Sequence, residues 1–288
     1  MQQEIQAAQE RLLEKRRELS HQTAPKPIGL LVPSSLHPLP EDDLCPLCDT
    51  ALTHPPDWLG GQAYCRVCAD AQSAIQLDLV KQDELERAAW VKQAQIERYL
   101  ADSCIGERFK GKVFADYQPV SQAATHALSV CREYASGFRS RSGTSLIFIG
   151  STGTGKNMLS AIIGQDIITR GFSFLHTTAL KIVRKYKDSW KQPDVTEEQV
   201  LSYYTTPDLL VIDEVGVQFG SPTEQLYLTE LINDRYEAMK PMILIANLTL
   251  KQVEDALGAR SMERFHENGG RVVVFNWASY RRQQRENI

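Results

Sequence analysis

A glycine-rich run in the middle of this 288-residue chain restricts its fold more than any other feature of the sequence. The run follows an apolar, β-rich stretch, SLIFI (145–149), and precedes a segment that is a candidate helix. It fits the G-x-x-x-x-G-K pattern of a phosphate-binding loop, in which backbone amides and a helix N-terminus face an anion. The loop consists of Gly150, Ser151, Thr152, Gly153, Thr154, Gly155, Lys156 and Asn157. A glycine-rich turn with a chance lysine is the alternative, and the flanking strand and helix favour the loop.

The last two residues of this loop have expected roles in binding a nucleotide. Lys156 is expected to reach the β- and γ-phosphates. Asn157 stands where Ser or Thr usually supplies a hydroxyl ligand to Mg²⁺, and its amide oxygen can ligate the ion or position a water instead. The loop therefore predicts ATP and Mg²⁺ as cofactors.

A second apolar run, LLVID (209–213), ends in two neighbouring carboxylates, Asp213 and Glu214. Asp213 is expected to hold Mg²⁺, and Glu214 is expected to orient and activate the attacking water. An apolar strand that ends in Asp-Glu is common and often structural when it stands alone. Here it follows a phosphate-binding loop, so the two motifs together predict an ATPase.

Short apolar runs alternate with longer helical stretches from about residue 105 onward. Such alternation, with strands that are apolar on both faces, predicts an α/β fold in which helices cover both faces of a parallel five-stranded sheet. The expected strands are 145–149, 172–177, 209–213, 242–247 and 271–276. The expected helices lie near 156–170, 178–191, 223–239 and 250–267.

The first third of the chain has a different organisation. A short helix and a proline-rich linker are expected in 1–43, a cysteine-rich module in 44–70 and a connecting helix in 71–104. The ATPase domain is expected to occupy 105–288.

The cysteine-rich module contains two C-x₂-C pairs with 16 residues between them, Cys45 with Cys48 and Cys65 with Cys68. This paired spacing is typical of a small zinc-ribbon-like module in which four thiolates hold one structural Zn²⁺. Four reduced cysteines in a loop, or a redox pair, are the alternatives.

The overall charge and hydropathy exclude several classes of protein. A net charge of −4 provides no global positive field for nucleic acid, so any DNA contact must come from a local basic patch. No apolar run reaches the roughly 18 residues that a membrane span needs, and the N-terminal segment lacks the apolar core of a signal peptide. We therefore expect a cytoplasmic protein without a membrane partner.

One local basic patch lies in the segment 181–191, where Lys181, Arg184 and Lys185 accompany Tyr186 and Trp190. Basic residues interleaved with aromatic ones suit single-stranded DNA. A solvated amphipathic helix, with Trp190 packed inward, is the alternative reading.

Three polar residues after the Asp-Glu strand are further candidates. Asn247 ends the run MILIAN at the sheet edge where ligands bind, and a turn residue at a strand end is the alternative reading. Arg260 and Arg264 follow in LGARSMERF, and one of them could reach the ATP of a neighbouring subunit. A solvated helix face is the alternative for either arginine.

The strings GSTGTGKN, DLLVIDEVGVQ, LGARSMERF and VVVFNWASYR together resemble the bacterial DnaC-type helicase loaders, over about residues 105–282. The resemblance implies an AAA+ ATPase fold that lacks a helical lid domain. It also implies that Asn247 is sensor 1, that Arg264 is an arginine finger and that Arg281 is sensor 2. Arg260 is the second choice for the finger.

The resemblance further implies a loader that self-associates on a DnaB-like hexameric replicative helicase and places it on single-stranded DNA. Hydrolysis of ATP would then be slow and stimulated by DNA. Two other functions stay open, a transposition helper of the related IstB type that acts on duplex DNA and a non-hydrolysing zinc adaptor. Intact Lys156, Asp213 and Glu214 argue against the adaptor. The N-terminal helix and the cysteine module are the candidates for binding the helicase.

Overall fold

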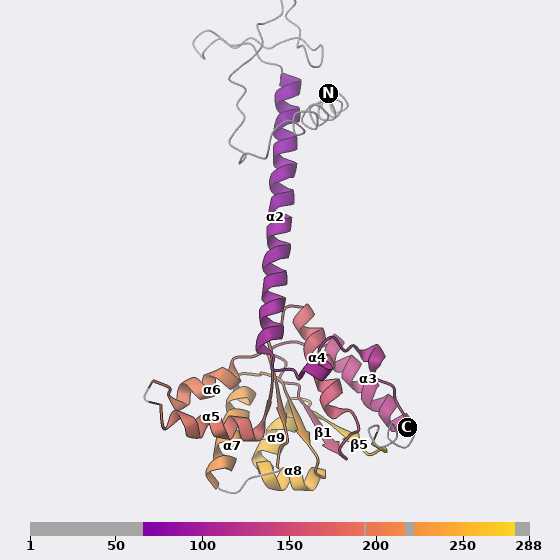
Figure 1. Cartoon of the computed structure of the whole chain (residues 1–288), viewed down its shortest axis with the longest axis vertical. Helices are drawn as coiled ribbons and strands as arrows, with labels where there is room; N and C mark the ends of the chain where they lie inside the picture. The colour runs from indigo at the N-terminus through magenta and orange to yellow at the C-terminus, as the bar shows by residue number, and fades with distance from the viewer. Residues whose placement is uncertain (1–65, 193, 217–221, 280–288) are drawn as a thin grey trace, which may run out of the picture. The chain divides into compact units, whose positions relative to one another are not determined.

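The structure is a computed structural model, and it describes residues 66–192, 194–216 and 222–279 (Figure 1). The chain divides into two units, Met1–Val91 and Lys92–Ile288, which we treat separately. The predicted N-terminal helix and most of the cysteine module lie outside the described residues. Cys68 lies in a described helix, which begins five residues before the connecting helix was expected.

Helix α2 (Arg66–Asp102) contains all the described residues of the first unit and continues into the second. Several large apolar side chains on it are exposed, Trp90 (71%) and Leu85 (70%) the most. Near its end, Ile96 and Tyr99 pack against the core of the second unit. Within the described ranges, no helix is both long and apolar enough to cross a membrane.

A parallel sheet forms the centre of the second unit, as the sequence predicts. The described part of the chain contributes five strands in the order β2-β3-β4-β1-β5, and every neighbouring pair is parallel. The strands are β1 (Leu146–Gly150), β2 (Phe174–Thr178), β3 (Leu209–Asp213), β4 (Met242–Ala246) and β5 (Arg271–Phe275). Each lies within two residues of its predicted range.

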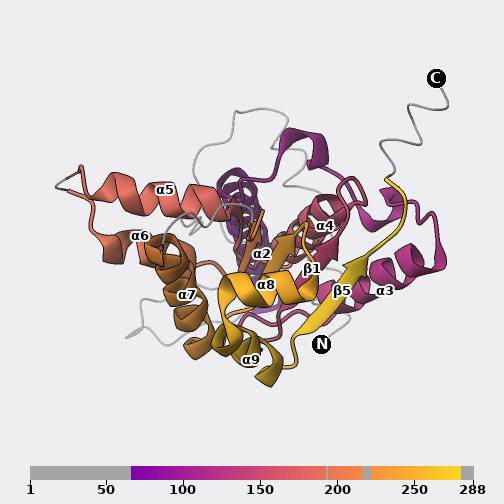
Figure 2. The ribbon, with the colours of Figure 1, turned by 90° about the horizontal axis from the view of Figure 1, so that it is seen from below.

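Helices cover both faces of this sheet. They are α3 (Gln122–Ser136), α4 (Lys156–Thr169), α5 (Ala179–Ser189), α6 (Glu197–Thr205), α7 (Pro222–Glu237), α8 (Leu250–Leu257) and α9 (Ala259–Glu267). Two 3₁₀ turns, η2 (Glu107–Phe109) and η3 (Phe114–Asp116), precede α3. Figure 2 shows α3 and α4 on one side of the sheet and α8 and α9 on the other.

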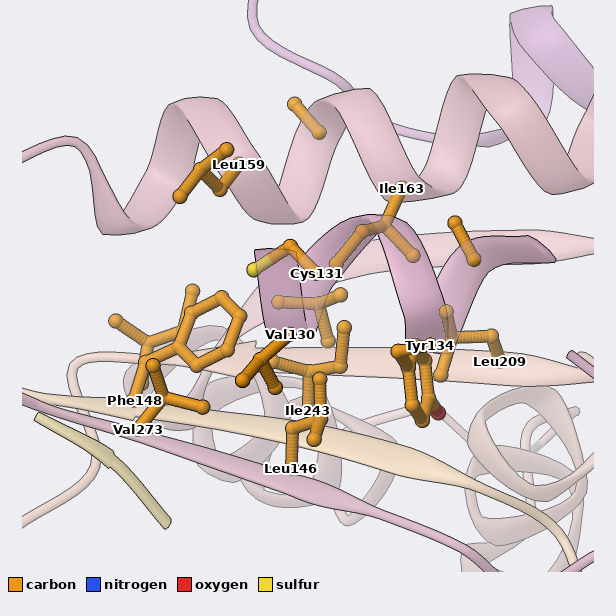
Figure 3. Packing of buried hydrophobic residues seen from close by; sticks show 14 of the residues in the cluster. Val130, Cys131, Tyr134, Leu146, Phe148, Leu159, Ile163, Leu209, Ile243 and Val273 are labelled. Atoms are coloured by element: carbon orange, nitrogen blue, oxygen red, sulfur yellow. The ribbon is translucent and has the colours of Figure 1, made fainter. Parts of the chain in front are cut away.

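The core is divided between the two faces because alternate residues of each strand point to opposite sides. Phe148 and Val211 face α3 and α4, whereas Ile147 and Ile212 face the layer formed by α5 to α9. In Figure 3, Leu159 of α4 and its neighbours from α3 pack over the strand residues of the first face. Strands buried on both faces explain why the sequence shows continuous apolar runs rather than alternation.

Three features of the helical layers differ from the sequence prediction. The predicted helix 250–267 is two helices, because Gly258 adopts a φ of 84° between α8 and α9. Helices α3 and α6 were not predicted. Trp190 does not pack inward, since 58% of it is exposed, and Tyr186 is buried instead.

Arg235 of α7 connects the layers on the second face. It is fully buried, and its Nη1 and Nη2 atoms donate to five backbone carbonyls at 2.7–3.3 Å, with one N–H of Nη1 shared between two of them. The acceptors are the carbonyls of Tyr204, Thr205, Pro207, Asp208 and Pro241. The first two lie at the end of α6, where a helix leaves its last carbonyls without partners. One side chain therefore satisfies the end of α6 and the segments that lead into β3 and β4.

We expect Arg235→Met to lower the free energy of unfolding by at least about 3 kcal/mol, because it leaves several buried carbonyls without donors. Urea denaturation followed by circular dichroism measures the change. Arg184→Met, the same replacement on the exposed side of α5, should change stability by less than about 0.5 kcal/mol. A loss at Arg235 no larger than that of the control would show that its hydrogen bonds contribute little.

Candidate nucleotide-binding site

The predicted phosphate loop connects β1 to α4 at the carboxyl end of the sheet. Three of its glycines have left-handed backbones, with φ values of 124° at Gly150, 79° at Gly153 and 98° at Gly155. A side chain at Gly150 would clash with the backbone carbonyl of Phe275, which belongs to the neighbouring strand β5. These positions require glycine both for conformation and for space, as expected for a loop that must wrap closely around an anion.

Lys156 begins α4 and points back across the loop. It is only 5% exposed, and its Nζ donates hydrogen bonds to the carbonyls of Gly150 (2.8 Å) and Ser151 (2.7 Å). Burial lowers the pKa of Lys156 to about 8, while the carboxylate of Asp213 opposes this shift by favouring the charged form. The ammonium is thus held beneath the loop, close to where a phosphate would lie.

Asn157 and Asp213, the two predicted Mg²⁺ ligands, meet across the site. Nδ2 of Asn157 donates a hydrogen bond of 2.5 Å to Oδ2 of Asp213, although 56 residues separate them in the sequence. A carboxylate and an amide oxygen are suitable ligands for Mg²⁺, and this closeness lets both reach one ion. The amide must turn by half a rotation to present its oxygen, so the pair fits the ion after one side-chain rearrangement.

Glu214 follows β3 with an unusual backbone. Its φ is 60°, a left-handed value that costs a residue with a side chain about 1–3 kcal/mol. Its N–H donates to Oδ1 of Asp213 at 2.8 Å, and the side chain is exposed at the sheet edge. Asp213 thus contacts Asn157 of the phosphate loop, and Glu214 follows it as an exposed carboxylate at the same edge of the sheet.

Asn247 lies at the same edge of the sheet. It is exposed and directly follows β4, the strand that pairs with both β1 and β3. Parallel strands end at one edge, so Asn247 lies between the phosphate loop and the Asp213–Glu214 pair. This position suits the predicted role beside a γ-phosphate.

The two candidate arginines of α9 have different surroundings. Arg260 is exposed, whereas Arg264 is half-buried with its guanidinium carbon 5.0 Å from the ring centroid of Tyr236. The Tyr236 hydroxyl in turn donates to the carboxylate of Glu267. Arg281, the candidate for sensor 2, lies outside the described residues, as do Cys45, Cys48 and Cys65.

The basic patch of α5 lies at the surface, as the sequence predicts. Lys181, Arg184 and Lys185 are all exposed, and Nζ of Lys185 lies 3.6 Å from the ring centroid of Tyr203 on α6. Trp190 follows the same helix and is also exposed, with its indole N–H donating to the carboxylate of Glu197. The helix thus presents cations and an aromatic ring to solvent.

Two residues at the site had no predicted role. Tyr117 and Trp277 both donate hydrogen bonds to the carbonyl of Thr154 in the phosphate loop. They lie 37 and 123 residues from Thr154, so no local motif marks them. A string such as FNWASYR carries family resemblance, but only the fold reveals which loop its tryptophan contacts.

We expect ATP binding to take up a proton above about pH 8. A bound phosphate favours the charged ammonium of Lys156 and so raises its pKa above the value of about 8 in the free protein. Between these two pKa values, the complex with ATP holds more protons than the free protein. The affinity for ATP should therefore fall as the pH rises through this range, by up to about tenfold per pH unit. Isothermal titration calorimetry in buffers of different ionisation enthalpy measures the uptake.

Lys156→Arg is the control for this measurement, since an arginine stays charged throughout that range. The variant should bind without the uptake, even if it binds more weakly. An affinity of the parent protein that stays constant from pH 7 to pH 9 would contradict the assignment.

The chain is similar to proteins of known families. The family of IstB-like ATP binding proteins matches residues 69–287. The replicative helicase loader DnaC of Escherichia coli (strain K12) is 35% identical over 168 residues, 58% of this chain and 68% of that protein. DnaC of Buchnera aphidicola subsp. Baizongia pistaciae is 30% identical over 193 residues, 67% of this chain and 78% of that protein.

Solved structures support the same fold. A crystal structure of the DnaC helicase loader matches with a TM-score of 0.54 and 20% identity, over 59% of this chain and 99% of that one. The replication initiator DnaA bound to AMPPCP and single-stranded DNA matches with a TM-score of 0.52 and 20% identity, over 61% of this chain and 52% of that one. The predicted AAA+ type of parallel sheet is thereby confirmed. The chain belongs to the family of IstB-like ATP binding proteins and is a homologue of the DnaC helicase loaders.

Proposed function

We propose that this protein is an ATP-dependent loader that places a hexameric replicative helicase onto single-stranded DNA. The similarity to the DnaC loaders, 35% identity over 168 residues, carries the proposal. The site supports its ATP-dependent part, because Lys156, Asn157 and Asp213 lie together at one edge of the sheet. Binding and hydrolysis of ATP act as the switch between holding the helicase and releasing it.

Each polar side chain of the site has one task in this switch. Lys156 and the loop amides bind the phosphates, and Asp213 and Asn157 hold Mg²⁺. The ion, when bound, neutralises charge on the β- and γ-phosphates. Glu214 and Asn247 orient the attacking water from the ends of β3 and β4. Arg264 acts on the ATP of an adjacent subunit, and Arg281 senses the nucleotide within its own.

The single-stranded DNA contact is assigned to α5. Exposed Lys181, Arg184 and Lys185 supply charge, and exposed Trp190 supplies a surface on which a base can stack. Stacking tolerates any sequence, as a protein that prepares arbitrary strands for a helicase requires.

The helicase-binding role is assigned to residues 1–103, with a Zn²⁺ held by Cys45, Cys48, Cys65 and Cys68. The spacing of the cysteine pairs supports the zinc site.

Elemental analysis of protein purified without added metal should find about one zinc per chain. A value near zero in folded, reduced protein would remove the zinc site from the proposal.

The proposal is tested by loading its cognate helicase onto single-stranded DNA and following the unwinding of a labelled duplex. Lys156→Ala should lose ATP binding and loading together. Glu214→Gln should bind ATP as the parent does but hydrolyse it at least about 100-fold more slowly, since only the water activation is lost. Glu198→Gln, on the exposed side of α6, is the matched control and should behave as the parent.

Two outcomes of this experiment would contradict the loader. Capture of no helicase, combined with ATP-dependent binding to duplex DNA, would favour a transposition helper of the IstB type. Hydrolysis by Glu214→Gln at the parent rate would show that another group activates the water.

Action of Arg264 in trans can be tested by mixing variants. Arg264→Ala should keep its ATP affinity and lose DNA-stimulated hydrolysis by about 100-fold or more. If Arg264 acts in trans, each ATP site combines the phosphate loop of one subunit with Arg264 of its neighbour. The Lys156→Ala variant has a damaged loop but an intact Arg264. Where an Arg264→Ala subunit lies beside it in a mixed assembly, an intact loop can meet an intact Arg264, and part of the ATPase activity should return. Arg260→Ala, one helical turn earlier, is the control and should hydrolyse ATP normally. Absence of recovery in assemblies that demonstrably mix would assign Arg264 to its own subunit.

A further inference from the structure

One carbonyl of the phosphate loop accepts hydrogen bonds from two side chains outside it. The hydroxyl of Tyr117 and the indole Nε1 of Trp277 both donate to the carbonyl oxygen of Thr154, each at 3.1 Å. Tyr117 follows η3, and Trp277 lies two residues beyond β5. Two segments from opposite ends of the ATPase domain therefore converge on one peptide group.

This peptide group determines the direction of a loop amide. In a planar trans peptide, the carbonyl of one residue and the N–H of the next point in opposite directions. The Thr154 carbonyl points outward to Tyr117 and Trp277, so the N–H of Gly155 points to the opposite side, into the loop. In a loop of this pattern, amides that point inward bind the phosphates.

The surrounding packing holds the two donors in place. Tyr117 is buried, and a Cβ at Gly155 would lie 2.5 Å from its ring. The ring centroids of Trp277 and Phe275 lie 5.0 Å apart, and Phe275 is fully buried. Burial raises the pKa of Tyr117 to about 12, so the phenol keeps the proton that it donates across the physiological range.

The loop needs such support because its conformation is costly by itself. Gly150, Gly153 and Gly155 have left-handed φ values, and glycine has the largest loss of backbone entropy on ordering. A free loop of this composition would sample other orientations of the Thr154–Gly155 peptide, in some of which the N–H would face away from the anion. Two outward hydrogen bonds select one orientation before the nucleotide arrives, which lowers the entropic cost of binding.

We propose that Tyr117 and Trp277 are positioning residues for the nucleotide phosphates, because together they hold the Gly155 amide toward the anion. The segment after β5 thereby contributes to phosphate affinity through Trp277 itself. This inference rests on the ATP site of the proposed function and is independent of the helicase and of DNA.

The test replaces each donor by phenylalanine, which removes the hydrogen bond and keeps an aromatic ring. Competition against a fluorescent ATP analogue gives the affinities of Tyr117→Phe, Trp277→Phe and the double variant for ATP, ADP and adenosine. Each single change should weaken ATP and ADP about 3–10-fold, the range expected for one hydrogen bond. The double variant should lose more than either, and the affinity for adenosine, which carries no phosphate, should stay within about twofold of the parent.

Tyr134→Phe is the matched control. Tyr134 of α3 also donates to a backbone carbonyl at 3.1 Å, that of Thr144, which does not belong to the phosphate loop. Loss of the Tyr134 hydroxyl should leave the ratio of ATP to adenosine affinity unchanged, even if it lowers the melting temperature.

Two results would overturn the inference. One is a double variant that binds ATP within twofold of the parent protein. The other is an equal loss for ATP, ADP and adenosine together with a lower melting temperature, which would assign the two residues to general stability. Lys156→Ala tests the ATP site of the proposed function separately. If ATP binding survives this change, the nucleotide binds elsewhere, and it is the proposed site that is wrong.

Discussion

The candidate site depends on the parallel register of three strands, β3, β4 and β1. Ile149 of β1 pairs with Ala246 of β4, and Ile212 of β3 pairs with Leu244 of the same strand. This register brings the phosphate loop, Asn247 and Asp213 to one edge of the sheet. A slip of one residue in β3 would turn Asp213 to the other face and bury it among apolar side chains. The apolar packing on both faces therefore fixes the polar chemistry at the edge, since only one register keeps every strand residue in its layer.

Charged and polar groups at this edge are bonded to one another within the protein. Lys156 donates to two loop carbonyls, and Asn157 donates to Asp213. Burial of these groups without partners would cost several kcal/mol, so the internal bonds stabilise the folded chain. Under the proposed function, a nucleotide and its Mg²⁺ would replace these bonds rather than add to them, because the ammonium and the carboxylate are the groups assigned to the ligand. Such an exchange would lower the net free energy of binding and so favour the reversible binding that the proposed switch needs.

The sequence predicted those parts of the fold and site that local patterns encode. The five predicted strands, the phosphate-binding loop and the Asp213–Glu214 pair are continuous runs whose chemistry is visible in fewer than ten neighbouring residues. The break at Gly258 was missed because its positive φ has no signal beyond the glycine itself. Inward packing of Trp190, the alternative reading, could not be excluded from the sequence, because helical spacing alone cannot tell which aromatic residue finds a neighbour. The contacts of Tyr117 and Trp277 with Thr154 could not be predicted, since they join segments that only the folded sheet brings together. The roles of Arg281 and of the four paired cysteines remain predictions from the sequence.

The surroundings of Arg264 bear on where an arginine finger can act. Helix α9 packs on the sheet face opposite to α4, and Arg264 stacks on Tyr236 of α7, which Glu267 holds by a hydrogen bond. Within the described ranges, its Nη1 atom is buried without a hydrogen-bond partner. An unpaired buried donor costs about 1–3 kcal/mol, and an acceptor for this nitrogen would remove that cost. An anion presented by a neighbouring subunit would give that nitrogen an acceptor, and the gain would favour movement of the side chain away from Tyr236. Under the proposed function, Arg264 would therefore leave Tyr236 of its own α7 when a neighbouring subunit presents that anion.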